Sequence, residues 1–346
     1  MSRKPAISVI IVFHNAESTI ERTLRSLAEQ TWHDAEYVFV DDGSSDRTVD
    51  VIQAFVALHP EFDGKHRLIS SPMRRGSAHA TGLGYANATG EYVIRCDADD
   101  TMDSRMLEIM YGATAGGQMD AVMSPYVMES DSKRVTVAYN RKPSGLNDMR
   151  MDTLHFSLCN KLLRRSILMD NELIPFDGVD CWEDVGVVAR FMALKPTVAF
   201  VDEPLYHYIV DKGVKSLSRS NANRLLHDHL LTALLLEQWF EEQSLHDEYD
   251  EFLTHLKFFA KVKMLRGRDK DVARWKGTFP EVNPRIMHLR HLKWYWRIVF
   301  GAVAALPTGL TQWIADRCDV LYPRIKADAV QQRPNDSHPN IPEQNQ

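Results

Sequence analysis

Three acidic groups in the sequence have the residue types and spacing needed to hold a cation or to accept a proton. Residues 41–46 and residues 97–100 each follow an apolar run, and Glu183 and Asp184 begin a helical pattern. Carboxylates at positions i and i+2 can direct two oxygens toward one hard cation, and Mg²⁺ or Mn²⁺ commonly binds such carboxylates together with substrate phosphates. One such group alone is more typical of a turn or a helix cap. Three groups together favour a binding or catalytic site.

The elements that must position these groups alternate along the first 130 residues. The strands predicted from apolar runs are Ile7–Phe13 and residues 36–40, 67–69 and 92–96. The first helix between them is expected to begin with a capping box formed by Ser18 and Glu21. Strands separated by roughly 15–25 residues of helical pattern predict βαβ units and a mainly parallel sheet. Ligands of such sheets bind at the carboxyl ends of the strands, where two of the acidic groups lie.

The character of the chain changes after this region. Residues 120–220 mix shorter strands with helices and complete the same α/β domain, whereas long helices are expected from residue 221 onward. Residues 327–346 are polar, rich in Pro, Asn and Gln, and predicted to be disordered. We therefore expect an α/β domain over residues 1–220, a helical region over residues 221–326 and a tail over residues 327–346.

Composition and charge exclude several classes of protein. The 346 residues are 44% hydrophobic and 25% charged, and the formal net charge of −6 argues against a protein built mainly to bind nucleic acid. The four cysteines form no Cys-x-x-Cys pair, so we expect reduced thiols in a cytoplasmic protein, without a zinc site or disulfide framework. The longest apolar run, residues 298–310, contains Pro307 and is shorter than the roughly 20 residues that cross a bilayer. Neither a transmembrane helix nor a signal peptide is expected.

The stretch from residue 282 to residue 315 contains no acidic residue. Its basic residues are Arg285, Arg290, Lys293 and Arg297, and they adjoin the aromatic residues 294–296. One interpretation is a helix that lies in the headgroup region of an anionic membrane, as a peripheral contact with the inner membrane face. The other is that the aromatic residues pack the helix onto the rest of the protein while its basic face is solvated.

Three segments in a fixed order resemble the family 2 inverting glycosyltransferases of GT-A fold. They are SVIIVFHN at residues 8–15, VDDGSSD at 40–46 and GEYVIRCDADD at 90–100. A second block is also similar to that family: NKLLRR at 160–165, WEDV at 182–185, EPLYHY at 203–208 and SLS at 216–218. The resemblance covers residues 7–220 and implies a GT-A fold, which is Rossmann-like with a mainly parallel sheet flanked by helices.

The resemblance assigns the donor side of the reaction to the first two acidic groups. It implies that Asp42 recognises the nucleobase, usually uracil, and that Phe13 and His14 hold the base and ribose. It also implies that Asp97 and Asp99 carry a divalent cation, Mn²⁺ or Mg²⁺, on the diphosphate of a nucleotide-sugar. Asp99 is the expected direct metal ligand. A cation held by carboxylates neutralises the charge that develops on a departing nucleotide diphosphate without donating a proton.

The third acidic group matches the pair that supplies the general base in that family. Asp184, with Glu183 beside it, would accept the proton of the acceptor hydroxyl as the oxygen attacks the anomeric carbon. A base on the face opposite the leaving group suits single displacement with inversion. The alternative for this pair is a structural helix N-terminus, where carboxylates are stabilised by the helix dipole.

Three further residues are weaker candidates. Arg75 precedes a small-residue helix and is a candidate for contact with phosphate or ribose, or else an exposed arginine. His207 is a candidate metal or diphosphate ligand, although a structural histidine is the alternative, because this position is often tyrosine in the family that the chain resembles. Lys212 lies in a loop that is either a lid over the diphosphate or a plain surface loop.

The function that the resemblance implies is sugar transfer. An inverting transferase of this family would move a sugar from a UDP-linked donor to a hydroxyl of a glycan or lipid-linked acceptor. Surface-polysaccharide assembly is the expected setting, and nucleic acid is not an expected partner. Two alternatives are a sugar-phosphate nucleotidyltransferase and a non-catalytic binding relic of the fold. A nucleotidyltransferase is expected to have a Gly-rich N-terminal loop, and residues 10–16 contain no glycine.

Overall fold

The computed structural model describes residues 4–210, 222–265 and 270–313, and a seven-stranded sheet lies at the centre of the first range. In spatial order the strands are β10 (Val198–Phe200), β6 (Ala121–Met123), β9 (Lys161–Arg164), β4 (Tyr92–Asp97), β1 (Ile7–Phe13), β2 (Ala35–Asp41) and β3 (His66–Ser70). Parallel pairs join β1 to β2 and β4, β2 to β3, and β6 to β10, whereas β9 runs antiparallel to β4 and β6. The predicted α/β fold with a mainly parallel sheet is confirmed.

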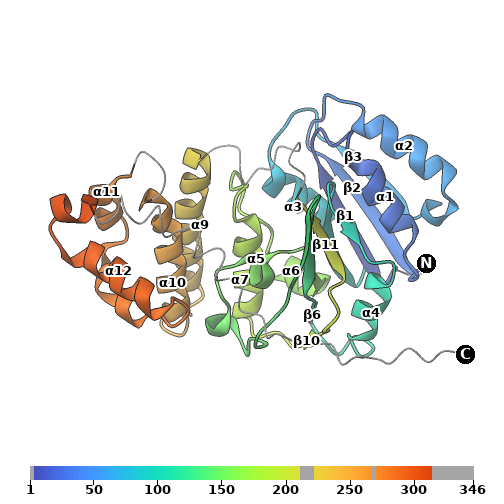
Figure 1. Cartoon of the computed structure of the whole chain (residues 1–346). Helices are drawn as coiled ribbons and strands as arrows, with labels where there is room; N and C mark the ends of the chain where they lie inside the picture. The colour runs from blue at the N-terminus through green and yellow to red at the C-terminus, as the bar shows by residue number, and fades with distance from the viewer. Residues whose placement is uncertain (1–3, 211–221, 266–269, 314–346) are drawn as a thin grey trace, which may run out of the picture.

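Helices cover both faces of this sheet, and β1 shows why (Figure 1). All seven of its residues are buried, and alternate side chains enter different cores because successive side chains of a strand point to opposite faces. Ile10 and Val12 join the core beneath α3 (Ser77–Asn87), α6 (Arg165–Asp170) and α7 (Glu183–Ala193). Val9 and Ile11 join the core beneath α1 (Ile20–Ala28), α2 (Thr48–Leu58) and α4 (Met106–Gly112).

The expected capping box at the start of α1 is wrong. The helix begins at Ile20 with Thr19 as its N-cap, and no side chain caps it. The carbonyl of Ala16 accepts the backbone N–H groups of Thr19 and Ile20, so a turn over residues 16–19 delays the helix by one residue. Glu21 then stands one position too early to complete the box.

A second, four-stranded sheet brings a distant segment to the end of β4. Its order is β5 (Thr101–Met102), β11 (Tyr206–Ile209), β7 (Tyr126–Ser130) and β8 (Lys133–Val137). Because β5 follows β4 after three residues and pairs with β11, residues 206–209 lie beside the acidic residues 97–100.

The helices after residue 221 form a region with its own core (Figure 1). They are α9 (Ala222–Glu242), α10 (Asp250–Lys261), α11 (Val272–Gly277) and α12 (Trp294–Ala305), with 3₁₀ segments η3 (Val262–Leu265) and η4 (Pro280–His288). The remaining short helices in the described ranges are η1 (Pro60–Phe62), η2 (Leu146–Asp148) and α5 (Thr153–Phe156). The predicted helical C-terminal region is confirmed, while the expected domain boundary at residue 220 and the tail at 327–346 lie outside the described residues.

Two sets of contacts join this region to the sheet domain. α9 packs on α7, and Leu253 and Leu256 of α10 belong to the same core as Ile10 of β1. Phe258, on the same helix, belongs instead to the separate C-terminal core around Trp275. None of the helices in the described ranges has the length and hydropathy required to cross a membrane.

Candidate active site

The loops that follow β1 and β2 are bonded to one another at the carboxyl edge of the sheet. The side-chain oxygen of Asn15 accepts the backbone N–H of Ser45 at 2.8 Å, and Nδ1 of His14 lies 2.9 Å from the carbonyl oxygen of Asp42. Asn15 has a left-handed backbone with φ of 53°, which asparagine tolerates better than most residues. Phe13 is buried at the end of β1. The three residues predicted to hold the nucleoside, Phe13, His14 and Asp42, therefore lie together.

The carboxylate of Asp42 also fixes the loop in front of α3. Its Oδ1 accepts the backbone N–H of Arg75 at 2.7 Å, and its Oδ2 accepts that of Gly76 at 2.9 Å. The chain passes so close here that a Cβ on Gly43 would lie 2.5 Å from the backbone of residue 73. The Arg75 side chain is half exposed, with Nη2 3.6 Å from a carboxylate oxygen of Asp177. A carboxylate offers about four acceptor positions, so Asp42 retains the capacity to bind a further N–H group.

The acidic group after β4 divides into a buried and an accessible part. The carboxylate of Asp100 is buried, where it accepts the Tyr206 hydroxyl and the backbone N–H of Ile209, each at 2.8 Å. Asp97 and Asp99 are only partly buried. Burial, followed by the charge of Asp97, raises the pKa of Asp99 to about 6. Asp100 therefore anchors the segment to the second sheet, and Asp97 and Asp99 remain for a ligand.

Arg95 connects this acidic group to the third one, a contact that the sequence analysis missed. Its guanidinium donates to Asp97 at 2.8 Å, to Glu183, and to the hydroxyls of Ser77 and Thr81, each at 3.1 Å. Burial disfavours the charged guanidinium, but Asp97 and Glu183 more than compensate, and the pKa of Arg95 is raised. One signal was present in the sequence: a charged residue inside an otherwise apolar buried strand requires charged or polar partners.

A buried lysine organises the other flank of Asp97. The ammonium of Lys161 donates to two backbone carbonyls in and just after α5 and to the side-chain oxygen of Asn160 at 2.8 Å. The same short segment carries Cys159, whose thiol lies 3.2 Å from Oδ2 of Asp97. Lys161 thus holds the backbone that places a thiol against a predicted metal ligand.

Glu183 and Asp184, adjacent at the start of α7, occupy different environments. Glu183 is buried, and its Oε1 accepts the Ser77 hydroxyl at 2.8 Å as well as the Arg95 guanidinium. Burial raises the pKa of Glu183 to about 7 although Arg95 opposes the shift. Asp184 is partly exposed, and its Oδ1 accepts only the N–H of Val185, at 2.8 Å, among the described residues. The pKa of Asp184 is raised, again chiefly by burial.

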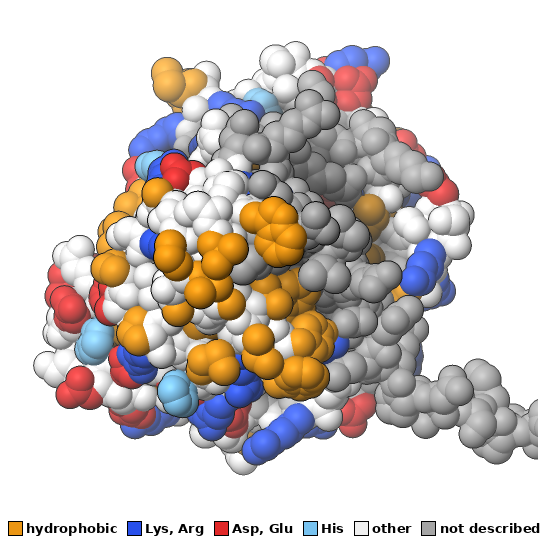
Figure 2. All heavy atoms as spheres, turned by 60° about the vertical axis from the view of Figure 1, so that its left-hand side comes forward, with side chains coloured by type: hydrophobic (Ala, Val, Ile, Leu, Met, Phe, Trp, Pro, Cys, Tyr) orange, Lys and Arg blue, Asp and Glu red, His pale blue; other side chains and the backbone are white. Residues whose placement is uncertain are grey.

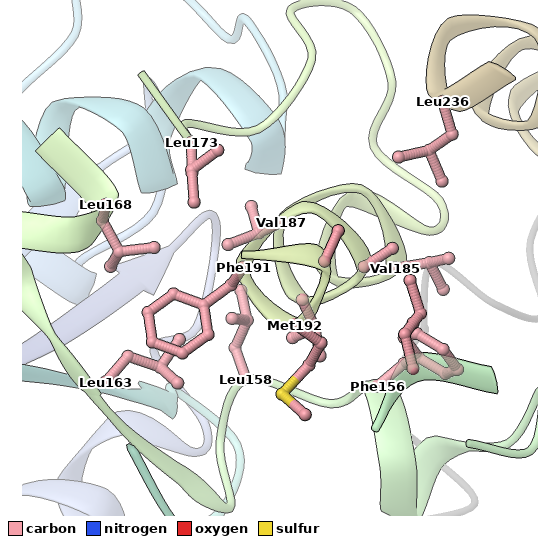
Figure 3. Packing of buried hydrophobic residues seen from close by; sticks show 14 of the residues in the cluster. Phe156, Leu158, Leu163, Leu168, Leu173, Val185, Val187, Phe191, Met192 and Leu236 are labelled. Atoms are coloured by element: carbon pink, nitrogen blue, oxygen red, sulfur yellow. The ribbon is translucent and has the colours of Figure 1, made fainter. Parts of the chain in front are cut away.

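The helix that carries this pair is firmly embedded. Val187, Phe191 and Met192 of α7 pack in the core shown in Figure 3, against side chains from β9, α6 and the segment after α5. The helix start is also constrained, because Trp182 has a left-handed backbone and its ring stacks on His229 of α9 with centroids 3.7 Å apart. A rigid helix of this kind holds Asp184 in a defined position.

His207 does not meet the predicted metal ligands in a ready-made cluster. It lies on β11 opposite Thr101, and its Nδ1 is 3.0 Å from a carboxylate oxygen of Glu129. The only trio of potential ligand atoms within 4.8 Å of one another, in the described ranges, is Glu237, Glu241 and His246 in the C-terminal region. Lys212 lies outside the described residues.

The residues present nevertheless fit a divalent cation bound with a diphosphate. Within the described part of the chain, the Asp99 carboxylate is bonded by its own backbone N–H and by no side chain, and Asp97 retains acceptor capacity beside Arg95 and Cys159. Mg²⁺ and Mn²⁺ need only one or two carboxylates when substrate phosphates supply other ligands. Asp99 and Asp97 are such a pair.

Known proteins that are similar to this chain include several glycosyltransferases. Residues 8–171 match the family profile described as "Glycosyl transferase family 2". A cholesterol galactosyltransferase of Borreliella burgdorferi is 25% identical over 76% of this chain and 76% of its own. A putative glycosyltransferase of Bacillus subtilis, EpsH, is 25% identical over 75% of this chain and 77% of its own.

Solved structures support the same fold. The structure of Staphylococcus aureus TarS residues 1–349 in complex with UDP has a TM-score of 0.65 at 18% identity and covers 93% of this chain and 92% of that one. A mannosyltransferase of Pyrobaculum calidifontis in complex with GDP-mannose and Mn²⁺ has a TM-score of 0.50 at 17% identity. The match covers 92% of this chain and 88% of that one. Residues 8–171 thus match the glycosyl transferase family 2 profile, and the chain is a glycosyltransferase of GT-A fold.

Proposed function

We propose that this enzyme transfers a sugar from a UDP-linked donor to a hydroxyl of a glycan or lipid-linked acceptor, with inversion at the anomeric carbon. The observation that carries the proposal is the difference in burial and hydrogen bonding among the acidic residues. Glu183 and Asp100 are buried and bonded within the protein, whereas Asp99 and Asp184 keep accessible carboxylates at the same edge of the sheet. One of these accessible groups suits a cation and the other suits proton transfer.

On the donor side, Phe13, His14 and Asp42 would hold the nucleoside, and Asp42 would accept an N–H of the base. Arg75, next to Asp42, would reach the ribose or diphosphate, and Lys212 is proposed to act from the part of the sequence that follows residue 210. Asp99, with Asp97, would hold Mn²⁺ or Mg²⁺. The cation, when bound, supplies positive charge to the departing diphosphate. His207 is proposed as a further ligand on the grounds of the family resemblance alone.

On the acceptor side, Asp184 takes the proton of the attacking hydroxyl. As that proton moves to the carboxylate, the hydroxyl oxygen bonds to the anomeric carbon and the bond from that carbon to the diphosphate oxygen breaks. UDP leaves with the electron pair, so the transfer needs no covalent enzyme intermediate. Glu183 does not take this role, because its Oε1 accepts from Arg95 and Ser77 and its Oε2 is buried.

The setting of the reaction follows from the relatives and the thiols. One relative is named for galactosyl transfer to cholesterol, a lipid acceptor, and surface-polysaccharide assembly is the setting that we propose here. Cys96, Cys159 and Cys181 are unpaired thiols, which suits the reducing cytoplasm that we propose as the location. We further propose that the enzyme makes peripheral contact with the inner membrane face.

The test is a screen of UDP- and GDP-sugars with Mn²⁺, Mg²⁺ or a chelator, in which release of nucleoside diphosphate and of pyrophosphate are measured separately. We expect release of UDP, dependent on the cation, and a product whose anomeric configuration is opposite to that of the donor by NMR. Release of pyrophosphate from a nucleoside triphosphate and a sugar phosphate would instead identify the nucleotidyltransferase alternative. Retention of configuration would contradict the role given to Asp184.

A further inference from the structure

Helix α12 has apolar side chains on two sides. Trp296, Phe300 and Val303 are buried against the C-terminal core. On the opposite side, Trp294 and Ile298 are 70% and 51% exposed. A helix that is hydrophobic all round is normally covered on all sides. The inner side is covered by the C-terminal core, and the outer side is left open by the described residues.

The open side of α12 belongs to a larger apolar surface. Met287 of η4 is 49% exposed, and a Cβ on Gly301 would lie 2.9 Å from its sulfur, so η4 and α12 present one continuous surface. Leu310 and Trp313 are also exposed. We call these five residues, Met287, Trp294, Ile298, Leu310 and Trp313, the α12 face. Figure 2 shows hydrophobic side chains gathered on this end of the molecule, with lysines and arginines along one border.

The charge at the border of the α12 face is positive. Helix α12 starts with Lys293 as its N-cap and has no acidic residue in its first turn, whereas α7 and α10 each have two. The guanidinium of Arg297 donates to backbone carbonyls at the same end of the helix. The exposed amide N–H groups of a helix N-terminus add a partial positive charge. Arg285 and Arg290, in the segment before the helix, are paired with Asp250 and Glu251.

We infer that the α12 face binds the headgroup region of an anionic phospholipid membrane. Tryptophan is enriched at that depth, aliphatic side chains enter the acyl boundary, and the positive helix end with Lys293 and Arg297 meets the anionic headgroups. A second copy of the chain is the competing occupant, and a dimer that is broken by substitutions on this face would reveal it. The inference rests on the proposed function in that a lipid-linked acceptor would be found at the same surface.

Sedimentation of the full chain with vesicles tests the inference. We expect at least tenfold stronger binding to vesicles of phosphatidylglycerol and phosphatidylethanolamine than to phosphatidylcholine vesicles, and a decrease in high salt. Trp294→Ser together with Ile298→Ser should lower binding at least tenfold. Leu58→Ser is the matched control, because Leu58 is a 79% exposed apolar residue on α2, in the sheet domain. This control should bind like the parent.

A second variant guards against a loss of binding that only reflects unfolding. Lys293→Glu places a carboxylate at the start of α12, where the helix dipole favours it, so the helix should not be weakened. We expect about a fivefold or larger loss of vesicle binding. The inference would be overturned if the parent did not bind vesicles or if the Trp294→Ser, Ile298→Ser variant bound them as strongly as the parent. It would also be overturned if the parent formed a dimer that the same double variant dissociates. Release of UDP by the parent in solution is a separate readout, so failure of the membrane inference and failure of the proposed reaction are distinguishable.

Discussion

The sheet domain and the C-terminal helices each bury one lysine in nearly the same way. Lys161 and Lys261 are both fully buried, and each ammonium donates to two backbone carbonyls and to one asparagine side chain. Burial lowers the pKa of both, to about 7 for Lys161 and about 8 for Lys261. The local chemistry of the two lysines is therefore closely matched.

The two lysines differ in where the bonded backbone leads. The segment held by Lys161 carries Cys159 to Asp97, and the charge of Lys161 opposes, in part, the burial that raises the pKa of Asp184. The segment held by Lys261 includes Phe279, which packs against hydrophobic cores, and the ammonium lies 4.5 Å from the ring centroid of Trp275. A buried charge thus says little about function by itself. Its connection to accessible carboxylates is what distinguishes the sheet domain from the C-terminal helices.

Asp184→Asn should have the largest effect, because it removes the accessible proton acceptor while keeping the side-chain volume. We expect sugar transfer to fall by roughly 10²–10⁴, with donor affinity nearly unchanged. Transfer rates and UDP affinity by calorimetry measure the two quantities. Glu183→Gln is the control, because side chains at adjacent helix positions point about 100° apart and only one of them can face the anomeric carbon. A loss confined to Glu183→Gln would move the role of base to Glu183.

Lys161→Met and Lys261→Met test the lysine comparison directly. Each removes a donor from three buried acceptors, so each should lower the free energy of unfolding by about 2–4 kcal/mol. Only Lys161→Met should also lower the transfer rate of the folded protein, because only this lysine adjoins the site. Denaturant unfolding and transfer assays at a temperature where both variants are folded provide the measurements. Equal activity in the two variants would refute the distinction.

Asp99→Asn should remove cation-dependent donor binding, because the charge of the carboxylate rather than its shape attracts the cation. We expect UDP affinity in the presence of Mn²⁺ to fall by about tenfold to a hundredfold, with little change in a chelator. Glu241→Gln, in the acidic trio of the C-terminal helices, is the matched control and should bind as the parent does. A parent-like affinity in Asp99→Asn would show that the cation is held elsewhere.

The pH dependence of transfer should report the burial of Asp184. The base must be deprotonated to accept a proton, and burial raises its pKa, so activity should fall on acidification at a higher pH than an ordinary aspartate would allow. Below that pKa the rate should drop about tenfold per pH unit. This acidic limb should be absent from the residual activity of Asp184→Asn. A limb that persists unchanged in the variant would assign it to another group.

The sequence alone was sufficient to predict the alternating elements and the edge of the sheet where the acidic residues meet. β-branched runs such as Ile7–Phe13 are local patterns, and the carboxyl ends of parallel strands lie at one edge whatever surrounds them. The resemblance to a known family also depended on contiguous motifs. The capping box was a local pattern too, but it failed because the backbone of Ala16 offered a competing turn.

Only the tertiary structure decided which of the acidic residues are accessible. Arg95 and Glu183 stand 88 positions apart, and Cys159 and Asp97 stand 62 apart, so no local pattern records that they pair. Those pairings bury Glu183 and leave Asp184 and Asp99 for a ligand, a choice that two adjacent carboxylates in a sequence cannot reveal. The physical reason is that burial and ionic pairing depend on how the sheet, α3 and α7 pack together, whereas residue order specifies only which groups can take part.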